Sequence, residues 1–250
     1  MNAVPLPAPL GTSLEVAGLV KRYGLETALD VPALEVAPGE RVALVGNNGA
    51  GKTTLLRSVL DLISPTAGTV AIDGLEVGGR DLAWKRRVGS YLDAGFLVDF
   101  LRPQEYFRLV GGAYGMTALE VDAEVERHRS FLGAALEGRR LIRDLSLGNA
   151  GKVGIVGALL PRPGLVVLDE PFANLDPGAR IALERLLVEV EATVLVSSHD
   201  LEHVVGVCSR ALVLSEGRVV RDTPSRADTL GELRGFFAAG GLEVAAQGGR

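Results

Sequence analysis

The chain has 250 residues, of which 47% are hydrophobic and 23% charged, a composition typical of a globular protein with a substantial core. Its formal net charge of −5 lacks the basic footprint of a nucleic-acid binder, so we expect no nucleic-acid partner. The single cysteine, Cys208, excludes an internal disulfide framework and a cysteine-based zinc site, and no uninterrupted apolar run is long enough to span a bilayer.

Short apolar runs alternate with helical patterns along the chain, which predicts a largely parallel sheet flanked by helices. Residues 13–21 and 25–31 are expected to form an early antiparallel pair. A short strand at 41–45 then leads through a Gly-rich turn into a helix from about 52 to 63. The next strand, 69–72, ends at the turn pair Asp73-Gly74.

Residues 94–150 have a different character, which predicts a small helical subdomain. Apolar residues recur there at helical spacing, and charged residues lie on the opposite face. The apolar residues are Val121, Val125, Leu132 and Leu136. Strands resume at 165–168, 193–197 and 211–214. The turn at 215–218 then predicts a hairpin into Val219-Val220.

The segment after the 41–45 strand satisfies the phosphate-binding pattern G-x-x-x-x-G-K-[ST]. Its residues are Gly46, Asn47, Asn48, Gly49, Ala50, Gly51, Lys52, Thr53 and Thr54. Glycines let the backbone N–H groups converge on phosphate oxygens, and the following helix adds its N-terminal dipole. We expect Lys52 to reach the β- and γ-phosphates of a nucleotide and Thr53 to bind Mg²⁺. The alternative, a Gly-rich turn that only caps a helix, is disfavoured by the strand–loop–helix context.

A second pair of functional groups follows the apolar run at 165–168, which is typical of a strand buried on both faces. Asp169 and Glu170 come directly after this run, where α/β sheets bind their ligands. Asp169 is expected to hold Mg²⁺, and Glu170 to act as the general base on an attacking water. Alone, the pair would be read as two solvated acids, but the upstream phosphate loop favours the catalytic interpretation.

The order of these motifs resembles the nucleotide-binding domain of the ATP-binding-cassette (ABC) family over roughly residues 13–221. Residues 145–149, Leu-Ser-Leu-Gly-Asn, resemble the family signature L-S-G-G-Q, with Leu147 and Asn149 replacing its first Gly and its Gln. A serine and a close-approach glycine at a helix N-terminus make an anion site. The resemblance implies that Ser146, Gly148 and Asn149 face the ATP held by an opposing subunit.

Other segments fit the same resemblance. Tyr23, in Lys-Arg-Tyr-Gly, resembles the residue that stacks on adenine. The segment Asn174, Leu175 and Asp176 resembles the loop through which two subunits sense each other. His199, in Ser-Ser-His-Asp, resembles the switch histidine that reaches the γ-phosphate. His128 and His203 lack such a context, and we interpret them as incidental.

One position departs from the family pattern. The family usually has a Gln downstream of the phosphate loop that touches Mg²⁺ and the attacking water. Aligning residues 88–93 with the common I-G-Y-L-P-Q places Asp93 there, whereas a one-residue slip places Ala94 there. A carboxylate binds Mg²⁺ more strongly than an amide but repels the γ-phosphate. Asp93 is therefore expected to join Thr53 and Asp169 as a metal ligand.

The expected fold class is α/β: a P-loop NTPase core with a mostly parallel sheet, an N-terminal antiparallel β subdomain and a helical subdomain. We expect a disordered tail at 1–12, the nucleotide-binding domain at 13–221 with its helical subdomain at about 94–150, and a partly disordered extension at 222–250. Within that extension, Leu230, Leu233, Phe236 and Phe237 are expected to form a short amphipathic helix.

The resemblance implies an ATPase that binds ATP and Mg²⁺ and pairs head to tail, either with its own copy or with a second ATP-binding chain. It implies a cytoplasmic subunit, peripheral on the inner face of the cell membrane, that powers transport through a separate transmembrane permease, with export favoured over import. The cargo is chosen by that permease. The alternative is a soluble ABC-type ATPase outside transport, such as one in iron–sulfur cluster assembly.

Overall fold

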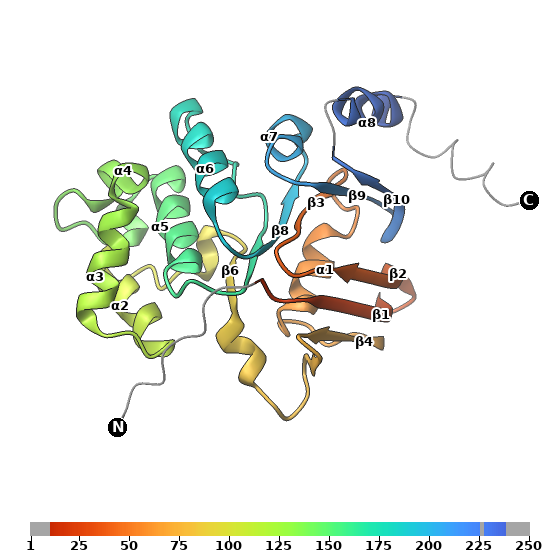
Figure 1. Cartoon of the computed structure of the whole chain (residues 1–250), viewed down its shortest axis with the longest axis horizontal. Coiled ribbons are helices and arrows are strands. Elements are labelled where there is room, and N and C mark those ends of the chain that lie inside the picture. The colour runs from red at the N-terminus through yellow and green to blue at the C-terminus, as the bar shows by residue number, and fades with distance from the viewer. Residues whose placement is uncertain (1–10, 226–227, 239–250) are drawn as a thin grey trace, which may run out of the picture.

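The structure is a computed structural model that describes residues 11–225 and 228–238. Its centre is a six-stranded sheet with the order β10-β9-β3-β8-β7-β6 (Figure 1). These strands are β3 (Arg41–Val45), β6 (Val88–Tyr91), β7 (Leu165–Leu168), β8 (Thr193–Ser198), β9 (Arg210–Ser215) and β10 (Arg218–Pro224). The pairs from β9 to β6 are parallel, and β10 turns back on β9 as the predicted hairpin. The predicted mostly parallel sheet is confirmed.

A four-stranded antiparallel sheet, with the order β2-β1-β4-β5, lies at one end of the molecule (Figure 1). It contains β1 (Leu14–Tyr23), β2 (Glu26–Val36), β4 (Ala67–Ile72) and β5 (Leu75–Glu76). The predicted early antiparallel pair is confirmed, but β2 continues past Pro32 to Val36. Proline is tolerated there because β2 is an edge strand, so the missing N–H costs no ladder hydrogen bond.

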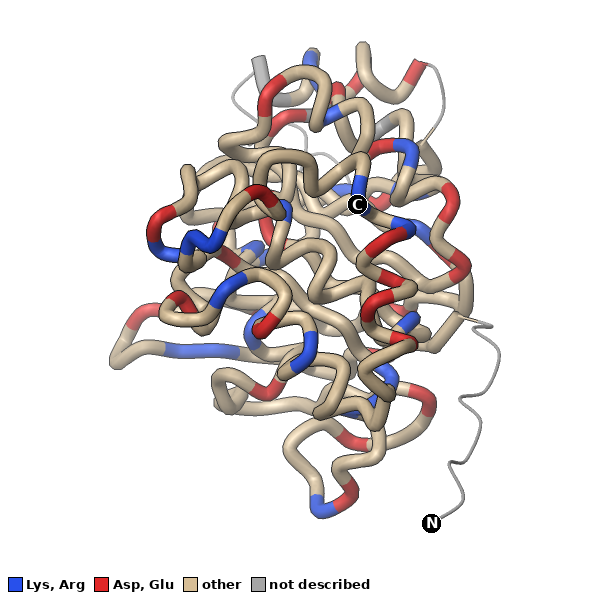
Figure 2. Tube along the Cα trace, turned by 90° about the vertical axis from the view of Figure 1, so that its left-hand side faces the viewer, with Lys and Arg blue, Asp and Glu red and all other residues tan. Residues whose placement is uncertain are grey.

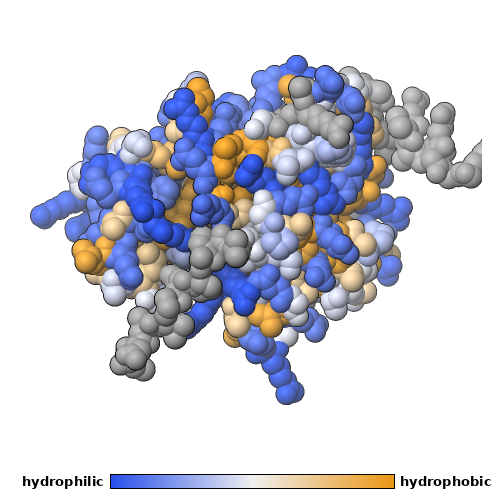
Figure 3. All heavy atoms as spheres, in the orientation of Figure 1, coloured by the Kyte–Doolittle hydropathy of each residue, from blue (hydrophilic) through white to orange (hydrophobic). Residues whose placement is uncertain are grey.

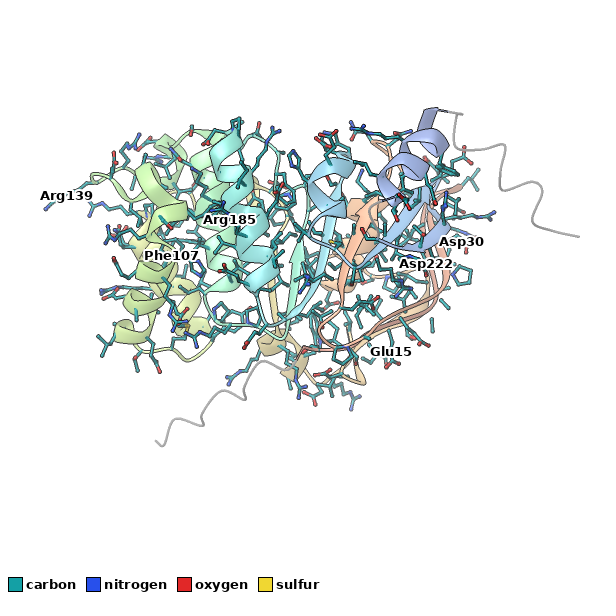
Figure 4. All side chains as sticks on the ribbon, turned by 45° about the horizontal axis from the view of Figure 1, so that its top comes forward. Glu15, Asp30, Phe107, Arg139, Arg185 and Asp222 are labelled. Atoms are coloured by element: carbon teal, nitrogen blue, oxygen red, sulfur yellow. The ribbon has the colours of Figure 1, made fainter. Side chains whose placement is uncertain are left out.

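The two sheets are joined beside the phosphate loop. Asp30 of β2 donates its backbone N–H to the carbonyl oxygen of Gly217 at 2.7 Å and accepts from Arg218 at 3.0 Å. Gly217 in turn donates its N–H to the carbonyl of Ala50 at 3.0 Å. Figure 4 labels Asp30 of β2 and Asp222 of β10 at this end of the molecule. These hydrogen bonds hold the β9–β10 turn against the phosphate loop.

The helix that follows the phosphate loop, α1 (Lys52–Val59), ends earlier than predicted. Asp61 adopts a left-handed backbone with φ of 58°, and Leu62 donates its N–H to the carbonyl of Arg57 at 2.9 Å. This is the bonding pattern that closes a helix C-terminus, usually with glycine in the left-handed position. An aspartate there gives no comparable sequence signal.

Helices dominate the end of the molecule opposite the antiparallel sheet (Figure 1). The segment contains α2 (Pro103–Ala113), α3 (Ala118–Arg127), α4 (Arg129–Leu132) and the start of α5 (Leu147–Leu159), with short 3-10 turns at Ala94–Phe96, Gly133–Leu136 and Ile142–Asp144. The periodic run from Val121 to Leu136 is broken at His128. Phe107, fully buried, packs among these helices (Figure 4). The predicted fold class, including its helical part, is confirmed.

Helix α5 carries a glycine at every third position: Gly148, Gly151, Gly154 and Gly157. A methyl group on Gly154 would lie 2.4 Å from the Tyr91 ring, and one on Gly157 would lie 2.7 Å from the Tyr106 ring. The glycines therefore let two tyrosine rings lie directly on the helix backbone. Burial, helped by nearby Asp93, raises the pKa of Tyr91 to about 12, so its hydroxyl stays protonated.

The remaining helices are α6 (Pro177–Glu189), α7 (Leu201–Val205), α8 (Thr229–Ala238) and the 3-10 turn at Ala83–Arg87. The predicted helix at 230–237 is present as α8, with Leu233 fully buried and Leu230 and Phe236 packed beside it. The side chain of Phe237 lies outside the described residues, as do the expected tail residues 1–10 and 239–250. Thr12 is buried and donates its N–H to the Gly164 carbonyl at 3.0 Å.

The surface agrees with a modest net charge. Acidic and basic positions are interspersed along the chain (Figure 2), and hydrophilic residues dominate the face in Figure 3, with small apolar patches between them. None of the helices in the described part of the chain has the length and apolar character that a membrane crossing needs. The core itself lies on both sides of the six-stranded sheet, because alternate residues of β3 and β7 enter two separate apolar clusters.

Candidate functional site

The phosphate loop forms a tight backbone cradle between β3 and α1. Gly49 and Gly51 have φ of 81° and 103°, values that favour glycine over residues with a Cβ. Lys52 is 6% exposed, and its Nζ donates to the carbonyl oxygens of Gly46 at 2.6 Å and Asn47 at 3.2 Å. The ammonium group is thus folded back over its own loop, where it is placed to meet an anion.

A cavity of about 430 Å³ opens over this cradle. Its lining includes every predicted ATP-binding residue from Asn47 to Thr54, together with Glu170. Gly46 does not line the cavity, and its carbonyl oxygen accepts from Lys52. Tyr23 does not line the cavity; its ring is 54% exposed, with Lys21 Nζ 5.0 Å from the ring centroid.

Five residues of the cavity lining were not predicted from the sequence. Glu26, Thr27 and Ala28 of the antiparallel sheet line it, as do Glu216 and Gly217 of the β9–β10 turn. The turn pair Glu-Gly was recognised as a hairpin. The turn lies over the phosphate loop because Gly217 contacts Ala50. These two residues are far apart in the chain, so the sequence does not predict their contact.

Asp169 lies beneath the cradle at the carboxyl end of β7 and is 6% exposed. Thr53 donates its hydroxyl to Asp169 Oδ2 at 2.7 Å, and the Ser197 hydroxyl donates to the other carboxylate oxygen. The described residues contain no group of three or more His, Cys, Asp and Glu that could hold a metal. One carboxylate and one hydroxyl nevertheless suit Mg²⁺, which prefers oxygen ligands and takes the others from water and substrate phosphates.

Glu170 connects the other predicted groups. Its Oε1 lies 3.5 Å from Lys52 Nζ, and its Oε2 lies 2.8 Å from His199 Nδ1. The backbone of Glu170 is left-handed, with φ of 48°, and its N–H donates to Ser197 Oγ at 2.9 Å. A left-handed non-glycine residue at a cavity edge is typical of a functional site. The structure therefore brings Lys52, Glu170 and His199 together at the edge of the cavity.

Asp93 follows β6, beside β7, but is not part of the cavity lining. Its carboxylate accepts from the N–H of Gly95 at 2.6 Å and caps the 3-10 turn at Ala94–Phe96. The nearer link to the site is through Tyr91, whose carbonyl accepts from the N–H of Asp169 at 2.8 Å. The role of Asp93 as a metal ligand remains a prediction.

The signature segment lies at the start of α5, where Ser146 is the N-cap and accepts from the N–H of Asn149 at 3.3 Å. Leu147 is 66% exposed. None of residues 146–149 lines the phosphate-loop cavity. The signature therefore presents its helix N-terminus to the outside of the chain.

The loop 174–176 packs directly on the signature. A methyl group on Gly148 would lie 2.3 Å from the Asn174 carbonyl oxygen, and Asn174 itself is left-handed with φ of 59°. Leu175 is buried. Asp176 caps α6 by accepting from the N–H of Ala179 at 2.9 Å, which lowers its pKa below the usual range. The two segments therefore form one connected surface.

The chain is similar to known ATP-binding proteins in its sequence and in its fold. A family model described as ABC transporter matches residues 29–173. The chain is 38% identical, over 86% of its own length and 86% of the relative's, to a Streptomyces avermitilis protein named as an ABC transporter ATP-binding protein. A solved structure of the ATP-binding subunit of an ABC transporter superposes with a TM-score of 0.78 at 30% identity, covering 89% of this chain and 93% of that one.

Other similar proteins carry more specific names. A Nod factor export ATP-binding protein of Paraburkholderia xenovorans is 33% identical over 84% of this chain and 70% of its own length. A phosphonates import ATP-binding protein of Anaeromyxobacter dehalogenans is 33% identical over 95% of this chain and 50% of its own length. A dimeric ATP-binding cassette bound to ADP and Pi has the same fold, with a TM-score of 0.75 at 24% identity over 86% of this chain and 99% of that one. The chain therefore belongs to the ATP-binding proteins of the ABC transporter family.

Proposed function

We propose that this chain hydrolyses ATP with Mg²⁺ and powers transport through a separate membrane permease. The observation that carries the proposal is the position of Glu170, whose two carboxylate oxygens face Lys52 at 3.5 Å and His199 at 2.8 Å at the edge of the phosphate-loop cavity. A general base between an anion-binding lysine and a histidine is suited to activate water beside a phosphate.

The chain's own residues divide the work of hydrolysis. Backbone N–H groups of residues 47–54 bind the phosphates, and Lys52 exchanges its loop carbonyls for phosphate oxygens. Glu170 accepts a proton from water as the water oxygen bonds to the γ-phosphorus and the bond to the β-phosphate oxygen breaks, releasing ADP. His199 orients Glu170 and the departing phosphate. Thr53 and Asp169 would hold Mg²⁺, which would supply positive charge beside the phosphates.

We further propose that the chain works as a dimer, of two copies or with a second ATP-binding chain. The signature at Ser146–Asn149 faces outward and does not line its own cavity, so its helix N-terminus is free to meet the nucleotide of another subunit. ATP that bridges two chains favours the closed dimer, and loss of phosphate lets it reopen. The dimeric cassette with the same fold supports this arrangement.

The permease is proposed to dock at the segment after Asp93, on the cytoplasmic side of the membrane. Phe96 and Phe100 are 54% and 64% exposed there, which is unusual for large aromatic side chains. The names of similar proteins include both export and import. We propose export as the direction of transport because it is the direction that the sequence resemblance favours.

The test is Mg²⁺-dependent ATP hydrolysis by the purified chain, compared with Glu170→Gln. The amide removes the base and keeps the shape, so we expect hydrolysis to fall by ~10²-fold or more while ATP binding persists. Light scattering should then show an ATP-bound dimer that accumulates. Glu189→Gln, an exposed carboxylate at the end of α6, is the matched control and should hydrolyse ATP like the wild type.

Two results would contradict the proposal. Glu170→Gln with wild-type turnover would remove Glu170 as the base. A wild-type chain that binds no ATP would exclude the phosphate-loop cavity as a nucleotide site. Turnover that appears only when a permease is added would support the transport role over a soluble ATPase.

A further inference from the structure

A group of charged and aromatic side chains surrounds His203 in α7. The ring is 19% exposed and stacks on Phe172, with centroids 5.2 Å apart and an interplanar angle of 22°. Its Nδ1 lies 2.9 Å from Glu184 Oε1 in α6. Its Nε2 lies 3.4 Å from an Arg180 nitrogen and 3.5 Å from Asp200 Oδ2. His203, interpreted as incidental from the sequence, thus has four partners that the sequence did not indicate.

Each partner of His203 leads to a segment that the proposed function uses. Phe172 is buried two residues after Glu170. Asp200 directly follows His199, whose own backbone N–H donates to Glu170 at 3.3 Å. Arg180 donates its Nε to the carbonyl oxygen of Leu175 at 3.0 Å, in the loop 174–176. One imidazole ring therefore contacts the segment that follows Glu170 and the segment that follows His199. Through Arg180 it is also linked to the loop 174–176.

The hydrogen-bond chemistry fixes how the ring joins these segments. An ionised Glu184 only accepts, so Nδ1 carries a proton. Nε2 faces one donor, Arg180, and one acceptor, Asp200. Without a proton Nε2 accepts from Arg180, and with one the positively charged ring lies within ion-pair distance of Asp200. In both states the ring remains bonded to α6 through Glu184 and stacked on Phe172, so it braces α7 against the segment that carries Glu170.

We propose that His203 is a positioning residue for ATP hydrolysis, which holds the switch segment and the loop 174–176 in register with Glu170. It lines no part of the phosphate-loop cavity, so it acts through Asp200, Arg180 and Phe172 and not on ATP itself. This role rests on the proposed hydrolysis of ATP by the chain. Its expected signature is a slower catalytic step with unchanged ATP binding, because misplacement by about 1 Å slows chemistry without removing the nucleotide site.

The test compares His203→Phe, His203→Gln and the control His128→Phe. Phenylalanine keeps the stacking on Phe172 and removes both ring nitrogens, whereas glutamine restores an N–H donor for Glu184. His128 lies between α3 and α4, where its buried Nδ1 has no partner, so its replacement removes a histidine away from the site. The measurements are kcat and KM for Mg-ATP, and hydrogen exchange of the backbone amides in 172–176 and 199–205 without nucleotide.

For His203→Phe we expect kcat to fall by ~10-fold or more, KM to stay within about 2-fold, and exchange to rise together in both segments. His203→Gln should recover part of kcat, and His128→Phe should match the wild type. The proposal is overturned if His203→Phe behaves like His128→Phe, or if exchange rises over the whole chain, because that would mark a general loss of stability. A wild-type chain without hydrolysis would contradict the proposed function, and the exchange pattern would still decide whether His203 joins the two segments.

Discussion

Replacing Gly148 with alanine tests the contact between the signature helix and the loop 174–176. The new Cβ would lie 2.3 Å from the Asn174 carbonyl oxygen, whereas a carbon and an oxygen in contact are normally about 3.3–3.6 Å apart. The loop or the helix must therefore move by roughly 1 Å. Both carry residues proposed to meet an opposing subunit, so we expect the change to affect stability and ATP hydrolysis together.

The size of the effect follows from two opposing terms. Overpacking costs about 1–3 kcal/mol, while alanine in place of glycine in a helix gains about 0.5–1 kcal/mol. Gly112→Ala in α2 is the matched control because a Cβ there meets nothing within 4 Å. The difference between the two variants cancels most of the helix term and leaves about 1–3 kcal/mol. At roughly 2–4 °C per kcal/mol, Gly148→Ala should melt some 2–12 °C below Gly112→Ala.

Thermal unfolding followed by circular dichroism gives the first difference, and Mg²⁺-ATP hydrolysis gives the second. A displacement of about 1 Å in a catalytic surface lowers turnover by on the order of 10²-fold, so Gly148→Ala should be strongly impaired and Gly112→Ala should not. If the two variants melt together and hydrolyse ATP at the same rate, the close packing of Asn174 on Gly148 is refuted.

Two further predictions concern stability. Leu233→Ala should lower the free energy of unfolding by about 2–5 kcal/mol in urea titrations, because Leu233 is fully buried. Leu119 is 80% exposed, so Leu119→Ala should change the free energy of unfolding by less than about 0.5 kcal/mol. Equal effects of the two variants would contradict the packing of α8 on the core. The Ala179 N–H lowers the pKa of Asp176 below its ordinary 3.8, so the carboxylate stabilises the fold above that pH and loses its effect as pH falls through the lowered value. The stability gap between wild type and Asp176→Ala should therefore be full at pH 7 and close in acid, and a gap independent of pH would contradict this.

The strands of the central sheet were predictable because burial on both faces leaves a continuous apolar run. The strands 41–45 and 165–168 match the sequence expectation residue for residue. Element ends were less predictable where residue type is misleading. α1 ends before Asp61, which has a left-handed backbone; a glycine at this position would have predicted the helix end, but an aspartate does not. β2 continues through Pro32 because β2 lies at the edge of its sheet.

The site shows the same division between local and tertiary information. Lys52, Glu170 and His199 were predictable because each lies in a local motif, and the fold brings them together. The positions of Glu216 and His203 were not predicted because they depend on contacts with residues distant in sequence, such as Ala50 for the turn and Glu184 for the ring. Composition and spacing carry no record of such contacts.

The glycines of α5 have a consequence for how the signature is kept in shape. Four glycines among 13 residues cost about 4 kcal/mol of helix propensity relative to alanine, so α5 is a poor helix in isolation. Its order is supplied from outside, by the rings of Tyr91 and Tyr106 against its backbone. Loosening β6 or α2 would therefore fray the start of α5, where Ser146 accepts from the Asn149 N–H, although neither tyrosine lines the phosphate-loop cavity.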